Sequence, residues 1–459
     1  RRLTVCVQGL GFVGAANAVA IALARDEAGQ PHFDVIGIDL PTQLGRERVA
    51  ALDAGRFPFA TADQELKRAA ELGQRTGNLR AVTDETALSE ADIIVVNIGL
   101  DLEQKGDRPT FRVEPFRTAL ASVARYMRPD ALILMESTVP PGTCEHIAVP
   151  VLRAGLEARG YSAESLLFAY CYERVMPGAH YLASITQMER VYAGLTGEAA
   201  DRAEQFLSRV VGKPLKRLAN LRSVELAKVL ENTYRAVNIA LIDEWERFAR
   251  RIDVDLFEVL EAIRVRPTHS NIRYPGLGVG GYCLTKDPVF GPAAAREIFG
   301  FEDLSFPMSM ASVRINDAMP MVTADTLEGL LPGGLKGRRV LILGASYLRD
   351  VGDTRTSPSA TLLAALIDRG ASVELADPLV QSFEEFAVPC HRHFPPPDGY
   401  DVIVFAVAHR EFRDLDVLGW LGAARPLVFD SNGVLDLPKL ASIRAAGIQV
   451  GAIGRGTIA

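Results

Sequence analysis

Residues 3–14 read LTVCVQGLGFVG, a short apolar run that leads directly into three glycines with the spacing G-x-G-x-x-G. The alanine-rich segment 15–25 that follows is typical of a helix. Between a strand and a helix, such glycines permit a tight turn and let a pyrophosphate approach the helix N-terminus. The stretch therefore predicts the opening of a dinucleotide-binding domain. The alternative is a turn of the same kind that binds no cofactor.

We expect five residues of this turn to contact the dinucleotide: Gly9, Gly11, Phe12, Val13 and Gly14. The next predicted strand, residues 33–38, ends at Asp39, somewhat later than the usual spacing of about 20 residues. A carboxylate at this position accepts hydrogen bonds from the ribose hydroxyls and repels a 2′-phosphate. The sequence therefore favours NAD over NADP.

Short apolar runs continue at 91–98 and 131–135, separated by helical patterns, which indicates a parallel, doubly wound sheet. From residue 221 an apolar helical pattern continues for many turns without Gly or Pro. It includes Val224, Ala227, Val229, Leu230, Tyr234, Val237, Ile239, Ala240, Ile242 and Trp245. A further helical pattern covers 256–263, before Pro267. A helix this long usually connects two domains or forms an oligomer interface.

A second α/β pattern follows the breaker Pro332-Gly333-Gly334. Its predicted strands are 339–343, 372–376, 402–407 and 427–429, with a helix over 359–369. We predict an α/β protein with two Rossmann-like, doubly wound domains joined by a long central helix and a helical middle domain. The expected boundaries are 1–215 for the NAD-binding domain, 216–325 for the middle domain and 326–459 for the second Rossmann-like domain.

Composition excludes several classes of protein. The 459 residues are 48% hydrophobic and 23% charged, with a net charge of −7, so we expect a soluble protein whose surface repels nucleic acid. The cysteines at 6, 144, 171, 283 and 390 form no C-x-x-C pair, and we expect neither a disulfide framework nor a metal site. No apolar run approaches the roughly 20 residues of a membrane span, and the start of the chain does not resemble a signal peptide. These features predict a cytoplasmic protein.

A cysteine in a glycine-rich run is the first candidate for covalent chemistry. Residues 276–287 read GLGVGGYCLTKD, and the glycines let the backbone approach a ligand closely. Lys286 could favour the thiolate of Cys283, and Asp287 could orient a water or take a proton. The alternative is that Cys283 is a small buried apolar residue.

Lys228 and Asn232 lie one turn apart on the same face of the long predicted helix. An ammonium and a carboxamide converging on one oxygen would stabilise an alkoxide or a tetrahedral adduct. The alternative is a solvated surface pair.

A rigid turn is predicted over 137–143, STVPPGT, at the carboxyl edge of the sheet, where open α/β sheets bind ligands. Thr138 could contact nicotinamide or a water, whereas Thr143 has the simpler interpretation of a helix N-cap. Glu173, in ERVMPG, is either a buried acid near the site or an ordinary partner of Arg174.

In their order along the chain, these motifs resemble those of the UDP-glucose/GDP-mannose dehydrogenase family, the nucleotide-sugar 6-dehydrogenases. The similarity rests on GLGFVG, STVPPGT, ERVMPG, the helix segment ELAKVLENTYRAVNIALIDEW, the loop GVGGYCLTKDP, and DVGDTRTSPS at 350–359, and it spans nearly the whole chain. The resemblance implies an NAD-binding domain, a helical region that forms a homodimer, and a carboxy-terminal domain that binds the nucleotide of a sugar nucleotide.

The resemblance also implies roles for individual residues. Cys283 would be the nucleophile, Lys228 and Asn232 the oxyanion pair, Thr138 and Asp287 the holders of a water, and Glu173 the acid beside the substrate. Ser137, Thr138, Lys286 and Arg355 match cofactor positions. The loop from Tyr274 through Gly276 to Gly280 would contact the sugar nucleotide, together with Glu173, Lys228 and Asn232. The implied reaction is a twofold oxidation at C6 by two NAD, through a thiohemiacetal and a thioester on Cys283, for polysaccharide or glycoconjugate synthesis.

Four positions depart from the family pattern. Ile98-Gly99-Leu100-Asp101 stands where the family has a Thr-Pro pair near the cofactor, and Leu348 stands where it has a substrate lysine, with Arg349 one position away. ERVMPG favours the UDP-N-acetylhexosamine branch over the UDP-glucose branch, yet Tyr282 and Tyr172 replace a histidine and a proline of that branch. The sugar and the base stay open.

Two other functions remain as alternatives. One is a single-step NAD-dependent hydroxyacid dehydrogenase, with Lys228 as acid and base and Cys283 as a bystander. The other is a non-catalytic NAD-binding sensor.

Overall fold

The computed structural model describes residues 2–105, 108–380 and 388–457. The chain divides into two compact units, the first formed by residues 1–231 and 289–305 and the second by 232–288 and 306–459. Each unit contains one large sheet, as the predicted fold class requires, and that prediction is confirmed. Within the described part of the chain, no helix is both long and apolar enough to cross a membrane.

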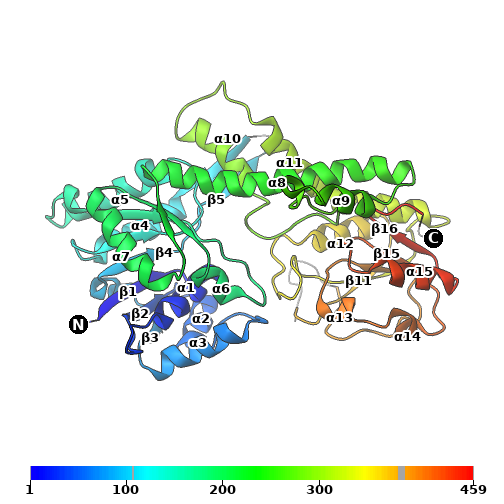
Figure 1. The fold of residues 1–459 in the computed structure, drawn as a ribbon, viewed down its shortest axis with the longest axis horizontal. Helices are drawn as coiled ribbons and strands as arrows, with labels where there is room; N and C mark the ends of the chain where they lie inside the picture. The colour runs from blue at the N-terminus through cyan, green and yellow to red at the C-terminus, as the bar shows by residue number, and fades with distance from the viewer. Residues whose placement is uncertain (1, 106–107, 381–387, 458–459) are drawn as a thin grey trace. The chain divides into compact units, whose positions relative to one another are not determined.

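The first unit contains a sheet with the strand order β10-β9-β8-β7-β4-β1-β2-β3 (Figure 1). Its strands are β1 (Leu3–Gln8), β2 (Phe33–Ile38), β3 (Leu79–Val82), β4 (Ile93–Val96), β7 (Leu132–Met135), β8 (Leu167–Cys171), β9 (Arg190–Gly194) and β10 (Leu215–Arg217). Every pair of neighbours is parallel except β8 and β9, which are antiparallel. A separate antiparallel hairpin is formed by β5 (Asp101–Lys105) and β6 (Arg108–Arg112). The first two strands have the predicted bounds.

Helices cover both faces of this sheet. One face packs against α1 (Phe12–Leu23), α3 (Gln64–Arg75), α6 (Tyr181–Thr186) and α7 (Gly197–Val210). The opposite face packs against α4 (Val113–Tyr126) and α5 (Val149–Ala158), with the short π-helix η2 (Cys144–Ala148) directly before α5. The remaining helices of the unit are α2 (Gln43–Asp53) and most of α10 (Asp287–Glu297).

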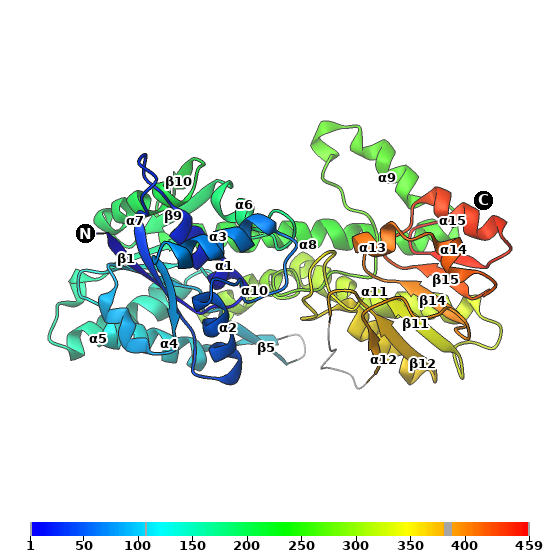
Figure 2. The same ribbon diagram turned by 90° about the horizontal axis from the view of Figure 1, so that it is seen from below.

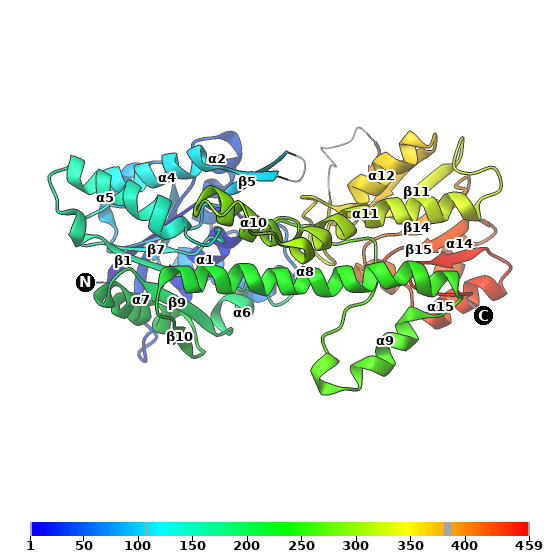
Figure 3. The same ribbon diagram turned by 90° about the horizontal axis from the view of Figure 1, so that it is seen from above.

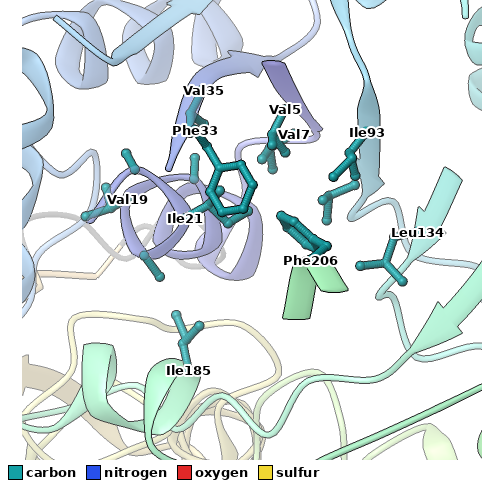
Figure 4. Packing of buried hydrophobic residues seen from close by; sticks show 14 of the residues in the cluster. Val5, Val7, Val19, Ile21, Phe33, Val35, Ile93, Leu134, Ile185 and Phe206 are labelled. Atoms are coloured by element: carbon teal, nitrogen blue, oxygen red, sulfur yellow. The ribbon is translucent and has the colours of Figure 1, made fainter. Parts of the chain in front are cut away.

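Successive residues of β1 enter different cores, because side chains of a strand alternate between the two faces of its sheet. Val5 and Val7 belong to one cluster, shown in Figure 4, and Cys6 belongs to the other. In the first cluster the rings of Phe33 and Phe206 meet edge to face, with their centroids 5.2 Å apart. A parallel sheet buried on both faces explains why its strands appear in the sequence as continuous apolar runs.

The second unit contains a parallel sheet with the order β13-β12-β11-β14-β15-β16, and Figure 2 shows β12, β11, β14 and β15 side by side. The strands are β11 (Arg339–Leu343), β12 (Ser372–Ala376), β13 (Cys390–His391), β14 (Val402–Phe405), β15 (Leu427–Asp430) and β16 (Val450–Ala452). One face packs against α11 (Pro307–Leu330) and α12 (Pro358–Asp368), the other against α13 (Arg410–Arg413), α14 (Val417–Leu421) and α15 (Leu437–Ala445).

The predicted long helix is α8 (Leu221–Arg251), which continues unbroken from the first unit into the second (Figure 3). It is followed by α9 (Leu256–Arg264). Its apolar residues do not share one environment as the sequence pattern suggested: Val224 is buried, whereas Leu230, Tyr234 and Trp245 are more than half exposed. The helix has apolar residues on more than one side, so the 3.6-residue pattern alone could not separate a core face from a surface face.

The turn between β1 and α1 is closely packed at its last glycine and open at its middle one. Gly9 has φ of +90°, and a Cβ on Gly14 would lie 1.7 Å from the carbonyl oxygen of Gly9. A Cβ on Gly11 would meet no atom within 4 Å. The two glycines are therefore needed for different reasons, Gly14 for the fold and Gly11 for space beside the helix N-terminus.

We predict that Gly14→Ala destabilises the protein by about 1–3 kcal/mol or more, since the added methyl group meets backbone that cannot move aside cheaply. Gly11→Ala is the matched control and should change stability by less than about 1 kcal/mol. Thermal and urea unfolding without cofactor measures both variants. Equal losses in the two would contradict this account of the turn.

A buried carboxyl group, that of Glu136, contacts the helix that follows this turn. Glu136, directly after β7, accepts a hydrogen bond from the Nδ2 of Asn17 on α1, and Asn17 also donates to Asn97 Oδ1 at 3.3 Å. Burial raises the pKa of Glu136 to about 7, assisted by the negative charge of Glu173 and opposed by Arg190 and the Asn17 hydrogen bond. The sequence gives no sign of this network, whose members lie far apart along the chain.

The raised pKa makes stability depend on pH in a definite direction. Glu136 holds its proton more tightly in the folded state than in the unfolded one, so its contribution is complete below pH 4.5 and is lost as the pH rises to about 7. The loss is on the order of 3 kcal/mol. We predict that Glu136→Gln gains stability relative to wild type as the pH rises from about 5 to about 8. Unfolding curves across this range test it, and parallel pH profiles for the two proteins would refute it.

Candidate active site

The predicted cofactor residues of the first unit lie around the carboxyl ends of β1, β2 and β7. Gly11 is the N-cap of α1, and no side chain caps this helix, which leaves its first turn able to bind an anion. Asp39 follows β2 directly, and its carboxylate pairs with Arg48 at 3.3 Å. Ser137 follows β7 by one residue and donates from Oγ to the carbonyl of Val96 at 3.3 Å. An open glycine, an uncapped helix and a carboxylate after β2 fit a dinucleotide.

Lys228 and Glu173 come together in the first unit. Lys228 is only 5% exposed, and its Nζ donates to the backbone carbonyl of Glu173 at 2.8 Å. The same ammonium lies 5.4 Å from the centre of the Tyr172 ring. The Glu173 carboxylate accepts a hydrogen bond from the backbone N–H of Val175. Lys228 is thus held in place by a carbonyl and an aromatic face, and a solvated surface lysine is excluded.

The alternative partner of Glu173 is also excluded. Arg174 pairs with Glu231 at 3.1 Å and lies over the Tyr172 ring, with 5.1 Å between guanidinium carbon and ring centre. Glu173 itself is 7% exposed. It is therefore a buried acid beside Lys228, which was the functional interpretation of its motif.

The thiol and its neighbours form a second group, within the second unit. Cys283 is exposed, so it is not the buried apolar residue that the alternative required. Its backbone carbonyl accepts a hydrogen bond from the N–H of Asp287 at 2.9 Å, which closes one tight turn before α10. The buried Asp287 in turn accepts from Asn232 Nδ2 at 2.7 Å, a bond between a carboxylate and a carboxamide that are 0% and 2% exposed. The structure thus joins Asn232 to Asp287 through their side chains and Cys283 to Asp287 through the backbone.

Two cations lie on the ring of Tyr282, next to the thiol in sequence. Lys286 Nζ is 4.7 Å from the ring centre and the guanidinium carbon of Arg355 is 5.5 Å from it. Lys286 also lies 3.4 Å from Asp287, and Arg355 makes a bidentate pair with Asp353, with bonds of 2.7 and 3.0 Å. The sequence suggested Lys286 and Arg355 as separate cofactor residues and did not show that one tyrosine holds both.

The proposed sugar-nucleotide loop is anchored at several points. Tyr274 stacks on Phe257 with 5.1 Å between ring centroids, and Arg264 lies 4.7 Å above Tyr274. The Gly276 N–H donates to Asp243 Oδ1 at 3.3 Å. Gly280 has no room for a side chain, because a Cβ would lie 2.4 Å from the carbonyl oxygen of Thr356.

Sequence reasoning missed two buried acids on α8. Asp243 is 1% exposed, and burial raises its pKa to about 7. Glu225 is 0% exposed and accepts from the backbone N–H groups of Gly142 and Cys144, where the sequence suggested a Thr143 cap. The Thr143 side chain makes no cap hydrogen bond. The sequence did carry a signal for these buried acids, because both stand inside an apolar helical pattern. Glu225 also lies three residues before Lys228.

Two departures have defined positions in the structure. Leu100 is fully buried, in the core that packs on α4 and α5. Leu348 is half-buried and Arg349 is exposed. Among the described residues, no group of three His, Cys, Asp or Glu side chains is placed to hold a metal.

Known proteins resemble this chain over nearly its whole length. It is 29% identical over 453 residues to the UDP-N-acetyl-D-glucosamine 6-dehydrogenase of Pseudomonas aeruginosa, covering 95% of this chain and 98% of that protein. It is 27% identical over 412 residues to the UDP-N-acetyl-D-mannosamine dehydrogenase of Methanocaldococcus jannaschii, covering 90% and 87%. The solved UDP-D-ManNAc dehydrogenase of Pyrococcus horikoshii superposes with a TM-score of 0.82 at 25% identity, covering 99% of this chain and all of that one.

Three domain families match in sequence along the chain. The NAD binding domain of the UDP-glucose/GDP-mannose dehydrogenase family matches residues 3–210, its central domain 222–318 and its UDP binding domain 341–437. The glycine turn, the Lys228 and Glu173 pair and the Cys283 group lie in or next to these matched segments. The chain is therefore an enzyme, a dehydrogenase that belongs to the UDP-glucose/GDP-mannose dehydrogenase family.

Proposed function

We propose that this enzyme oxidises the C6 hydroxyl of a nucleotide sugar twice, with two NAD, and releases a uronic acid. The observation that carries the proposal is the group formed by Cys283, Asn232 and Asp287. Cys283 is exposed, and its carbonyl accepts from the backbone N–H of Asp287, whose buried carboxylate accepts from Asn232 Nδ2 at 2.7 Å. A thiol in this setting can take up an aldehyde and hold it through a second oxidation.

The reaction balances as follows. The substrate alcohol loses a hydride and its hydroxyl proton to become an aldehyde, and the Cys283 thiol adds its sulfur to that carbonyl carbon and its proton to the carbonyl oxygen. The resulting thiohemiacetal loses a second hydride and a proton to become a thioester. One water then cleaves the carbon–sulfur bond, releasing the carboxylate and restoring the thiol. NAD, when bound, supplies the oxidising capacity by accepting one hydride per oxidation.

The protein groups have separate roles in this proposal. Lys228 and Asn232 stabilise the negative oxygen of the alkoxide and of the tetrahedral adducts. Thr138 and Asp287 hold the water, Asp287 takes its proton, and Glu173 lies beside the substrate. Gly9, Gly11, Phe12, Val13, Gly14, Asp39, Ser137, Lys286 and Arg355 bind the cofactor. Support comes from the burial of Lys228, Asn232 and Asp287, because hydrogen bonds to charged groups are stronger when water is excluded.

The proposed substrate is a UDP-N-acetylhexosamine, with UDP-glucose as the next candidate. The similar proteins from Methanocaldococcus jannaschii and Pseudomonas aeruginosa are named for UDP-N-acetylmannosamine and UDP-N-acetylglucosamine. ERVMPG at 173–178 favours the same class. The nucleotide would bind the carboxy-terminal domain, proposed at 326–459, with the loop from Tyr274 to Gly280 against the sugar nucleotide.

A single hydride transfer or NAD binding without turnover would make Cys283 dispensable, so the thiol separates the three functions. We predict two NADH per sugar for wild type on one of UDP-glucose, UDP-N-acetylglucosamine, UDP-N-acetylmannosamine or GDP-mannose. Cys283→Ala should lower turnover to the acid by about 10³-fold or more. Cys390→Ala, which removes a half-buried thiol of the same unit, is the control and should keep wild-type activity.

Absorbance at the NADH wavelength and quantification of the uronic acid measure the stoichiometry. One NADH per sugar, unchanged in Cys283→Ala, would identify the single-step alternative. Cofactor binding without turnover on any of the four sugars would favour the sensor.

We also propose a homodimer formed through α8, in the middle domain proposed at 216–325. Six large apolar side chains of this helix, and that of Ile252 directly after it, are half-exposed or more: Leu226, Leu230, Tyr234, Leu241, Trp245, Phe248 and Ile252. Trp245 and Phe248 also meet edge to face, with ring centroids 6.1 Å apart. An apolar stripe of this length is typical of a surface that a second protein covers.

We predict that Trp245→Glu weakens the dimer by about 30-fold or more, because a buried aromatic anchor contributes about 2 kcal/mol or more and the new charge opposes burial. Leu72→Glu, on the exposed side of α3, is the control. Light scattering after size exclusion measures the mass of each. A Trp245→Glu protein with the mass of wild type at low micromolar concentration would contradict a dimer through α8.

A further inference from the structure

Glu225, on the first turns of α8, binds two backbone amides with its two carboxylate oxygens. Oε2 accepts from the Gly142 N–H at 2.6 Å, and Oε1 accepts from the Cys144 N–H at 2.8 Å. Gly142 is the sixth residue of the STVPPGT turn and Cys144 directly follows it, so both amides lie at the start of the helical segment that continues into α5. A carboxylate at a helix N-terminus meets unsatisfied N–H groups and the positive end of the helix dipole. Charge-assisted bonds of this length are the strong class.

The turn that Glu225 binds has little freedom to move. Gly142 has φ of +91°, and a Cβ there would lie 2.7 Å from the Phe299 ring. At the other end of the turn, Ser137 Oγ is anchored to the Val96 carbonyl at 3.3 Å. The segment carrying Thr138 is therefore fixed at Ser137 by the sheet and at Gly142 and Cys144 by α8.

The same turns of α8 hold a second loop. Lys228 follows Glu225 by three residues, so the two side chains lie on neighbouring parts of one face, and Lys228 Nζ donates to the Glu173 carbonyl at 2.8 Å. Glu225 thus ties the Thr138 turn to the helical segment that presents Lys228. All of these residues belong to the first unit.

We propose that Glu225 is a positioning residue for the reaction: it fixes the Lys228 ammonium relative to the Thr138 hydroxyl by clamping the backbone of Gly142 and Cys144. The proposal rests on the proposed function, because it assumes that Lys228 and Thr138 act on the same substrate. Glu225 is fully buried and reaches the chemistry only through these two neighbours. A simple helix cap would have the same bonds but would affect stability alone.

Both carboxylate oxygens of Glu225 are needed to hold the amides of Gly142 and Cys144. In Glu225→Gln one acceptor oxygen remains, while the amide NH2 faces one of the two backbone N–H groups, so that donor meets donor. In Glu225→Asp both oxygens remain on a side chain that is one methylene shorter and cannot reach both amides equally. Glu225→Asp keeps the negative charge and shortens the side chain, whereas Glu225→Gln keeps the length and loses the charge. Comparing the activities of the two variants therefore separates the effect of charge from the effect of side-chain length.

The experiment measures steady-state kinetics as the reduction of two NAD per sugar, near pH 8.5, above the value of about 7 to which burial raises the pKa of the Glu225 carboxyl group. We expect Glu225→Gln to lower kcat by about 10²-fold, as a misplacement of roughly 1 Å does. KM for the sugar and the Kd of NAD should change by less than about 3-fold, because the binding groups are intact. Glu225→Asp should lie between Gln and wild type.

Glu145→Gln is the matched control. Glu145 lies in the same helical segment beside Cys144 and pairs with Arg222 of α8 at 2.7 Å, so its loss perturbs the same helix contact without touching the Gly142 and Cys144 amides. This variant should keep kcat. Amide exchange should accelerate at Gly142 and Cys144 in Glu225→Gln and remain unchanged in Glu145→Gln.

A folded Glu225→Gln with kcat within about 2-fold of wild type would overturn the proposal. If Glu225→Gln does not fold, Glu225→Asp with wild-type kcat would overturn it, and a lowered kcat at unchanged KM would support it. If wild type oxidises none of the four sugars, the proposed function fails and the positioning role fails with it. A wild type that turns over, with an unchanged kcat in Glu225→Gln, overturns the positioning role alone, and unchanged amide exchange at Gly142 and Cys144 in Glu225→Gln overturns it in either case.

Discussion

Four segments that carry proposed catalytic or binding groups are each joined to α8 by hydrogen bonds with a side chain of that helix. Glu225 accepts from the amides of Gly142 and Cys144, Lys228 donates to the Glu173 carbonyl, Asn232 donates to the Asp287 carboxylate, and Asp243 accepts from the Gly276 amide. Loops have few internal constraints, so their positions depend on such contacts. Side chains of one helix therefore hold the partners of Glu225 and Lys228 within the first unit and those of Asn232 and Asp243 within the second.

This arrangement costs stability, because carboxylates leave water only at a penalty. Burial raises the pKa of Glu225 and of Asp243 to about 7, and in both cases hydrogen bonds from backbone amides oppose the rise. Within the described chain, Asp243 Oδ2 and Glu246 Oε2 are buried without a hydrogen-bond partner. Apolar residues would stabilise a helix of this length better, so the acids indicate selection for loop position rather than for stability alone.

The features that could be predicted from the sequence are local ones. LTVCVQGLGFVG places a strand, a turn and a helix within twelve consecutive residues, and Lys228 and Asn232 share a face through helix periodicity alone. Glu225 and Glu136 could not be predicted, because their partners are 81 to 83 and 119 residues away along the chain. The exposed Trp245 belongs to the same apolar pattern as the buried Val224, because a period of 3.6 does not distinguish a core from an interface.

The replacement of the family's lysine by Leu348 lies in a loop whose backbone is held firmly. Asp377 Oδ2 accepts from the Ala345 N–H at 2.8 Å and from Ser346 Oγ at 2.7 Å, and the buried His409 accepts from the Asp350 N–H at 2.8 Å. Burial alone would raise the pKa of Asp377, but its hydrogen bonds with His409, the Leu379 N–H and Ser346 lower that pKa to about 2. The carboxylate therefore stays ionised and the loop keeps its shape at any physiological pH. With the backbone held at both ends of the loop, we expect any effect of this replacement on the proposed substrate to come from the side chains of Leu348 and Arg349.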